Sequence, residues 1–425
     1  MPLPDIPMTY IWAVRAVAVT RTSREIGNLR MKRIWPFAFS FLFFAGVASV
    51  SPFTVLYYRG LGFTGAQIGL LTSISPLITL FSAPLWTGLA DVTRRHRLIM
   101  SLALLVGVVM MLIFPLLNAF APVLLVSILF NAFFAPVSSF ADSATMVMLA
   151  DEKEMYGRIR LGGTIGYGLT APIAGMLVQN YGLKWAFWGT AALFLLAFIV
   201  SQKLVYSQVK ADDPARHSVR ALLANPRWLL FLFLAAASGM ALTATNTYFF
   251  PYMKELGAKE SMMGLALTIG TLSEIPVLFF GHQFVKRLKP YGLLMLTMVV
   301  TVIRFLLFAA IRTPNLALFV QLLNGLTFPA MWVAGVSYAY ENAPAGMGAT
   351  AQGIFSATVF GLGTAIGGFA GGLLLESVGG RGLYLVFGVV LLAIVAIVTL
   401  IQRRLPAEQK TSPLPDGGVN PRCGG

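Results

Sequence analysis

The sequence has little charge and almost no cysteine for its length. Of its 425 residues, 11% are charged and 57% are hydrophobic, whereas about 25% of the residues in an ordinary globular domain are charged. Such a composition excludes water as the main solvent for the surface of the chain. The single cysteine, Cys423, leaves no argument for a disulfide within the chain or for a cysteine-based metal site.

Long apolar runs are what the sequence has instead. They recur at about twenty residues each, the length that a helix needs to cross a bilayer. Windows of about nineteen residues predict six transmembrane helices in the first half, near 34–57, 66–87, 98–118, 122–147, 161–180 and 185–204. They predict six more in the second half, near 228–252, 262–284, 291–311, 315–340, 350–375 and 382–402.

Polar segments divide the chain into five parts. The expected parts are an N-terminal leader, a first six-helix bundle, a linker, a second bundle and a disordered cytosolic tail, at 1–30, 31–205, 206–227, 228–403 and 404–425. The leader has no signal-peptide cleavage pattern, and its mixed apolar stretch is too short to span, so we expect it to be cytosolic. An interfacial helix there, and a true start at Met31, are both open interpretations.

Lysine and arginine are concentrated in alternate loops. The cation-rich segments hold Lys32/Arg33, Arg94/Arg95/Arg97, Lys153/Arg158, the linker, Lys286/Arg287/Lys289 and Arg403/Arg404. Because cation-rich loops stay on the cytoplasmic side, both termini are expected in the cytosol, with the helices in the inner (cytoplasmic) cell membrane. The net charge of +15 is spread over short loops without a continuous basic face, so the expected surroundings are the lipid bilayer and not nucleic acid.

Two unrelated motifs recur at one offset of 193 residues. Gly88 begins GLADVTRRHR and Gly281 begins GHQFVKRLKP, and NAFFAP from Asn131 recurs as NGLTFP from Asn324. A shared offset favours duplication. The expected fold class is therefore an all-α membrane protein with 12 transmembrane helices in two pseudo-symmetric six-helix bundles, with a cavity between them.

The loop after the second predicted span carries a carboxylate among arginines. Asp91 beside Arg94 and Arg95 can make charge-assisted bonds across a cytosolic gate in one conformation only. A topology anchor is the alternative, and it explains the arginines but not Asp91. The loop resembles the signature of the major facilitator superfamily, Gly-x-x-x-Asp-x-x-x-Arg-Arg or a near variant, which Gly88, Asp91, Arg94 and Arg95 keep loosely.

Four ionisable residues fall within or at the ends of predicted spans, namely Asp142, Arg160, Glu274 and Arg304. Each such group at membrane depth costs at least ~2.5 kcal/mol and therefore faces a cavity or a partner. The sequence thus predicts two ion pairs, one in each half, and static pairs that lock two helices are the alternative. Glu376, next to two glycines near the outer face, is expected to be a solvated helix end.

The spacing of Asp142 and Arg160 carries a more specific resemblance. It resembles the branch of the superfamily that holds lactose permease, phenylpropionate permease and nucleoside-proton symporters. In that branch an acid near the end of the fourth helix precedes, by eighteen positions, the arginine of an aromatic-Gly-(Arg/Lys)-x-Arg motif, read here as YGRIR from Tyr156. The resemblance implies that Tyr167 holds the place of a sugar-stacking aromatic, with ordinary helix packing as the alternative. Arg160 and Tyr167 share one helix face about 10 Å apart.

The second half resembles the phenylpropionate permease through Glu274 and Arg304. It departs from the branch at the tenth helix, where Trp332 stands in place of a histidine. The three histidines lie in segments expected to be cytosolic, at His96, His217 and His282. Proton coupling is then expected to use carboxylates, Asp142 or Glu274 first and Glu341 third. Asn131 of the repeated motif completes the candidate residues for substrate binding or proton coupling.

These features together predict a monomeric secondary transporter, with a small-molecule substrate and protons as its partners, no metal or other cofactor, and the proton gradient as its energy source. Uptake by symport of a sugar, nucleoside or aromatic acid is the first hypothesis, with alternating access of two bundles. Proton-antiport efflux is the second, although Ala171 replaces the first glycine of the antiporter signature Gly-Pro-x-x-Gly. A membrane enzyme lacks a nucleophile-base arrangement in the spans, and a channel fits the two-fold repeat and the paired charges less well.

Overall fold

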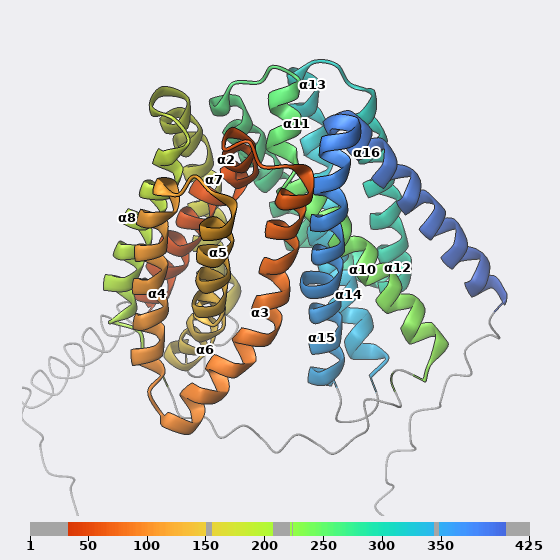
Figure 1. The fold of residues 1–425 in the computed structure, drawn as a ribbon. Coiled ribbons are helices and arrows are strands. Elements are labelled where there is room, and N and C mark those ends of the chain that lie inside the picture. The colour runs from red at the N-terminus through yellow and green to blue at the C-terminus, as the bar shows by residue number, and fades with distance from the viewer. Residues whose placement is uncertain (1–32, 150–154, 207–221, 223, 344–347, 405–425) are drawn as a thin grey trace, which may run out of the picture.

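The structure is a computed structural model, and it describes residues 33–149, 155–206, 222, 224–343 and 348–404. The predicted leader, the predicted tail after Arg404 and nearly all of the predicted linker lie outside the described residues. The described chain is helical, and no strand occurs among these residues. Figure 1 shows the helices running roughly parallel to one another, as they do in a membrane-spanning bundle.

The first half holds six stretches that are long and apolar enough to cross a membrane. These are Arg33–Gly60, Gly65–Thr93, His96–Leu116, Phe120–Leu149, Tyr156–Tyr181 and Lys184–Ser201. Their labelled elements are η1 (Ser51–Phe53), α2 (Thr54–Gly60), α3 (Gly65–Thr93), α4 (His96–Ile113), η2 (Phe114–Leu116), α5 (Phe120–Phe134), α6 (Val137–Leu149), α7 (Tyr156–Tyr181) and α8 (Lys184–Ser201).

The second half contains longer, broken helices. Its elements are α10 (Pro226–Asn246), α11 (Phe249–Glu255), α12 (Glu260–Ala310), α13 (Pro314–Val320), η4 (Gln321–Leu326), α14 (Phe328–Glu341), α15 (Gly348–Ala357), the π-helical η5 (Thr358–Gly363) and α16 (Thr364–Arg404). Non-helical backbone at Lys289, just before Pro290, divides α12, and Gly379 divides α16 in the same way. Each of these two helices therefore contributes to two crossings.

With α16 divided at Gly379, the described residues hold twelve stretches that are apolar enough to cross a membrane, which confirms the predicted all-α membrane fold. An even number of crossings places Arg33 and Arg404 at the same end of the molecule. We call this end the terminal face and the opposite end the distal face. The short elements α2, α11 and α13 lie together at the distal face (Figure 1).

The duplicated motif breaks one helix in each half. In the fourth span, α5 ends at Phe134, and α6 begins just after Pro136. In the tenth span the chain tightens into the 3-10 turn η4, passes through non-helical Thr327 and resumes as α14 at Phe328, just before Pro329. Proline lacks the N–H that would continue the helix and clashes with the preceding turn. The repeat in sequence is therefore also a repeat in local structure.

Glycines allow the two halves to touch in two places. Where α3 meets α16, a Cβ added to Gly372 would lie 2.5 Å from the carbonyl oxygen of Gly65. Where α7 meets α12, a Cβ added to Gly264 would lie 2.4 Å from the carbonyl oxygen of Ala171. Small residues at helix contacts in membranes allow such close backbone approach.

Polar contacts between the halves accompany this packing at the distal face. Arg59 Nη1 lies 2.9 Å from Glu255 Oε1, and the N–H of Gly65, the first residue of α3, donates to Glu376 Oε2 at 2.8 Å. Glu376 is exposed and lies near the helix break at Gly379, as expected of a solvated helix end, but its carboxylate is also aimed at the electropositive end of a helix in the other half. Further cross-half hydrogen bonds join Thr72 to Tyr248 (3.0 Å) and Ser261 to Gln179 (2.7 Å).

Candidate functional site

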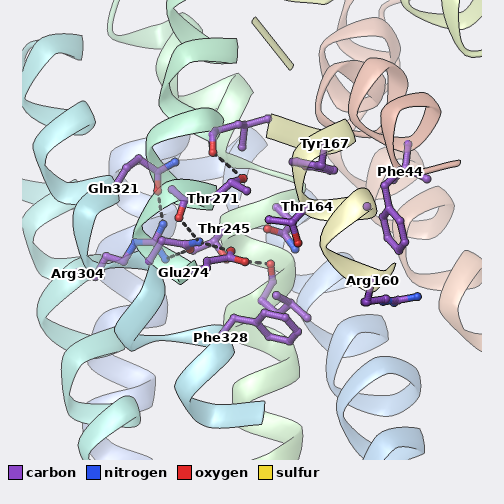
Figure 2. A pocket seen from close by; sticks show the side chains of 17 residues that line it. Phe44, Arg160, Thr164, Tyr167, Thr245, Thr271, Glu274, Arg304, Gln321 and Phe328 are labelled. Atoms are coloured by element: carbon purple, nitrogen blue, oxygen red, sulfur yellow. Dashed lines mark hydrogen bonds between the residues drawn. The ribbon is translucent and has the colours of Figure 1, made fainter. Parts of the chain in front are cut away.

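A cavity of about 330 Å³ lies between the halves, at the lower end of the roughly 300–1,000 Å³ range of small-molecule sites. Its walls come from the first span and α7 in one half and from α10, α12, η4 and α14 in the other. Figure 2 shows Arg160 and Phe44 on one side of it and Glu274, Arg304 and Gln321 on the other. Both halves therefore supply charged groups to one cavity.

Asp142 and Arg160 form the expected ion pair of the first half. Arg160 Nη1 donates to Asp142 Oδ1 at 3.0 Å, and the two side chains keep 41% and 39% of their exposure. The Arg160 guanidinium also lies 4.8 Å from the centre of the Phe44 ring. A pair this exposed is held by about 0–1 kcal/mol. Arg160 can therefore exchange Asp142 for another anionic or polar partner at little cost.

Glu274 and Arg304 are linked through an amide and do not form the expected direct ion pair. Arg304 Nη1 donates to Asn324 Oδ1 at 2.8 Å, and Asn324 Nδ2 donates to Glu274 Oε1 at 2.7 Å. The 3-10 turn η4 places Asn324 between the two charges, which is why the predicted direct contact is wrong. The Arg304 side chain also donates to Gln321 and Thr327, and the residue is only 2% exposed.

The remaining cavity candidates differ in position. Tyr167 lines the cavity from α7, on the same wall as Arg160. Trp332 instead packs against Phe355 and Phe360, with ring centres 5.3 and 5.1 Å apart, and is not among the residues that line the cavity. Asn131 lies in α5, where it donates to Ser75 Oγ and to the Ser127 carbonyl. Glu341 lies exposed at the terminal-face end of α14.

The candidate gate residues meet a different partner from the one expected. Asp91 Oδ1 lies 2.8 Å from Nε2 of His96, and Arg94 adopts a left-handed backbone conformation (φ 57°) that ends α3. Arg94 and Arg95 are exposed, and a Cβ added to Gly88 would meet no atom within 4 Å. In this conformation the Asp91 carboxylate therefore pairs with a histidine, and the proposed contact with an arginine remains a prediction.

Sequence reasoning missed the neutral polar residues of the second half. Asn324, Gln321 and Thr327 surround Arg304, and Asn246 and Thr245 also line the cavity or its edge. The signal for Asn324 was present in the repeat, since it matches Asn131 at the offset of 193. Hydropathy does not distinguish an amide side chain that faces a cavity from one that hydrogen-bonds within its own helix. The sequence therefore predicts Asn131, and not Asn324, as a candidate for the site.

The matched family agrees with this architecture. The family model described as MFS_1 like family matches residues 35–386, and the chain belongs to that family within the major facilitator superfamily. The protein is thus a secondary transporter and a multi-pass membrane protein, and not an enzyme.

Several known transporters are similar over most of the chain. The uncharacterized transporter YwbF of Bacillus subtilis (strain 168) is 26% identical over 370 residues, 86% of this chain and 93% of the relative. The maltose permease of Geobacillus stearothermophilus is 25% identical over 379 residues, 89% and 96% of the two chains. The multidrug resistance protein MdtG of Salmonella newport (strain SL254) is 30% identical over 313 residues, 68% and 76% of the two chains.

Solved structures share the fold at lower identity. The nucleoside transporter NupG gives a TM-score of 0.77 at 19% identity, with 88% of this chain and all of NupG covered. A bacterial homolog of the human lysosomal transporter Spinster, in an inward-facing and unoccupied conformation, gives 0.71 at 15% identity and covers 88% and 97% of the two chains. These similarities establish the arrangement of the helices and nothing about the solute.

Proposed function

We propose that the protein is a proton-coupled symporter that takes up a small polar or anionic organic solute through the central cavity. The observation that carries the proposal is the placement of Arg160 on one wall and of the Glu274–Asn324–Arg304 unit on the other, one from each half. A solute that contacts both walls favours closure of the halves around it. Such closure is the basis of alternating access.

Glu274 is the proposed proton carrier. A carboxylate at membrane depth costs at least ~2.5 kcal/mol unless a partner compensates it. Its partner here is the neutral amide of Asn324, and the compensating charge of Arg304 lies beyond that amide. Protonation makes Glu274 neutral, and a neutral carboxyl needs no compensating charge. Glu274 can therefore change its charge during the cycle without exposing the charge of Arg304 to lipid.

Arg160, Phe44 and Tyr167 form the proposed solute-binding wall. A guanidinium with an open face binds carboxylate or hydroxyl groups, and aromatic faces pack against sugar or base rings. Sugars, nucleosides and aromatic acids all present this combination. The maltose permease and NupG are named for solutes of the first two kinds, which supports the choice of probes.

Two rigid bundles, 31–205 and 228–403, are the proposed moving units, joined by the linker 206–227. We propose that both termini lie in the cytosol and the helices in the inner membrane, on the distribution of lysine and arginine. We also propose that the chain works as a monomer, as members of this superfamily commonly do. The distal face, where the halves are in contact, is then the outer face.

Efflux by proton antiport is the second candidate. It is favoured by the similarity to MdtG, a multidrug resistance protein, at 30% identity. The arginine and the amides of the cavity favour a polar solute over a hydrophobic drug, and Ala171 departs from the antiporter signature. Uptake therefore remains the first proposal.

Uptake into proteoliposomes tests the proposal. Vesicles with an imposed proton gradient are given radiolabelled maltose, uridine or phenylpropionate, with Asp142→Asn, Arg160→Ala and Glu274→Gln beside the parent. We expect one solute to accumulate only under an inward-directed proton gradient, Glu274→Gln to lose accumulation, and Asp142→Asn and Arg160→Ala to accumulate less at a given solute concentration. Expulsion of a hydrophobic dye against an opposing proton flux, without accumulation of any solute, would replace uptake with efflux.

A further inference from the structure

Asn324 is held by two opposite charges at once. A guanidinium only donates hydrogen bonds and a carboxylate only accepts them, whereas an amide does both from different atoms. The Oδ1 atom accepts from Arg304 at 2.8 Å, and the Nδ2 group donates to Glu274 at 2.7 Å. With both neighbours charged, only this orientation of the amide satisfies both. The amide direction is therefore set by both charges, with Arg304 at Oδ1 and Glu274 at Nδ2.

The duplicated copy of this asparagine has no such role. At the offset of 193, Asn324 corresponds to Asn131, but Glu274 corresponds to Phe81 and Arg304 to Met111. Asn131 accordingly donates to Ser75 Oγ at 3.0 Å and to the Ser127 carbonyl at 2.7 Å. The chain thus carries one copy of the amide between charges and one copy between neutral groups. If the helix break itself required an asparagine between two charges, both copies would have charged partners.

The Glu274–Asn324–Arg304 unit faces the solute cavity, and its Arg304 end is held in place by further residues. Glu274, Asn324, Gln321 and Arg304 all line the cavity. Thr327 and Gln321 accept further hydrogen bonds from Arg304 Nη1 and Nη2, and the residue is 2% exposed, so the guanidinium has little freedom to follow Glu274 if that side chain moves. Any change of partner must therefore occur at the amide.

We propose that Asn324 is a positioning residue that links the protonation of Glu274 to Arg304 and to the bound solute. When Glu274 is charged, the amide is fixed between the two groups. When Glu274 carries a proton, its carboxyl no longer needs the Asn324 donor, and the amide is released to hydrogen-bond a hydroxyl or carbonyl of the solute. The inference rests on the proposed symport function and assigns the contact through which solute and proton affect each other.

Infrared spectroscopy of the protein in phosphatidylcholine vesicles tests the link without a solute. The C=O stretch of a protonated carboxyl group is recorded during a pH titration, and the Glu274 band is identified as the one that Glu274→Gln removes. In Asn324→Leu this band is expected to persist to higher pH, because the charged carboxylate loses the hydrogen-bond donor that stabilises it. The matched control Asn131→Leu is expected to leave the pH range over which the Glu274 band disappears as it is in the parent.

Each outcome has a separate meaning. A Glu274 band that disappears over the same pH range in the parent and in Asn324→Leu, or at lower pH in the variant, overturns the link but leaves the proposed symport intact. The absence of any Glu274-dependent band, at every pH at which the protein stays monodisperse, overturns Glu274 as the proton carrier itself. If Asn324→Leu does not fold, Asn324→Ala removes the same donor without adding a charge, and the same shift is required of it.

Discussion

At the residue scale, the cavity uses its two arginines differently. Arg160 keeps 41% of its side-chain exposure and one ion-pair partner, whereas Arg304 is 2% exposed and donates to three neutral side chains. An exposed pair costs little to separate, while removal of one partner from a buried network leaves unpaired polar groups behind. Arg160 is therefore suited to bind a solute and Arg304 to hold the site in place.

Replacement of Arg160 by alanine is predicted to weaken solute binding. A hydrogen bond to a charged group contributes roughly 1.5–3 kcal/mol, so the apparent affinity for the solute that accumulates should fall by about ten- to a hundredfold. Uptake kinetics in proteoliposomes measure this change. Arg158→Ala, two residues away and exposed, is the control and should retain the parental KM. An equal loss in both variants would mean that the effect is general to the start of α7.

Substitution of Tyr167 tests the aromatic wall. Tyr167→Leu should raise KM several-fold, since an aromatic contact is worth about 0.5–1.5 kcal/mol beyond its buried area, whereas Tyr167→Phe should stay near the parent. The comparison is made by the same uptake kinetics. An unchanged KM in Tyr167→Leu would assign Tyr167 to helix packing.

At the element scale, hydropathy predicted every crossing but not the irregular backbone within them. The division of α12 at Lys289 falls between the predicted spans 262–284 and 291–311, because the charged loop carries its own signal. The 3-10 turn η4 lies inside the predicted span 315–340, where no charged loop marks it, and only Gly325 and Pro329 of the repeated motif accompany it. The sequence thus predicted Glu274 and Arg304 as neighbours, while the amide between them depended on a distortion that periodicity does not encode.

The contact between α3 and α16 gives a prediction about helix packing. In Gly372→Ala the added Cβ would lie 2.5 Å from backbone atoms of Gly65 and Gly69, so the helices must separate. Overpacking of this kind costs about 1–3 kcal/mol, and we expect a lower thermal unfolding midpoint and slower uptake. Gly353→Ala is the control, because its Cβ would meet no atom within 4 Å. Equal midpoints for the two variants would contradict a tight contact at Gly372.

At the scale of the whole molecule, the halves meet at the distal face and must separate there for alternating access. The sequence predicted two halves with a cavity between them, because the duplication is visible in short motifs. It did not predict which face is closed, since contacts such as Arg59–Glu255 and Gly65–Glu376 join residues that are remote in sequence. The expectation of a solvated helix end at Glu376 consequently did not include its hydrogen bond with Gly65.

A crosslink across the distal face should stop the cycle. Gln179 and Ser261 hydrogen-bond between the halves at 2.7 Å, so Gln179→Cys with Ser261→Cys, in a Cys423→Ser background, should form a disulfide or accept a short thiol crosslinker. Uptake should fall on oxidation and return on reduction. Each single cysteine variant serves as a control, and full uptake by the crosslinked protein would exclude opening at this face.

The direction of proton movement tests the proposed symport most directly. Proteoliposomes that contain a trapped pH indicator, with no imposed gradient, are given an inward gradient of the solute identified in the uptake screen. Symport predicts acidification of the vesicle interior at a rate that saturates with solute, and Glu274→Gln should abolish it. Alkalinisation of the interior by the same solute gradient would contradict symport and establish proton antiport.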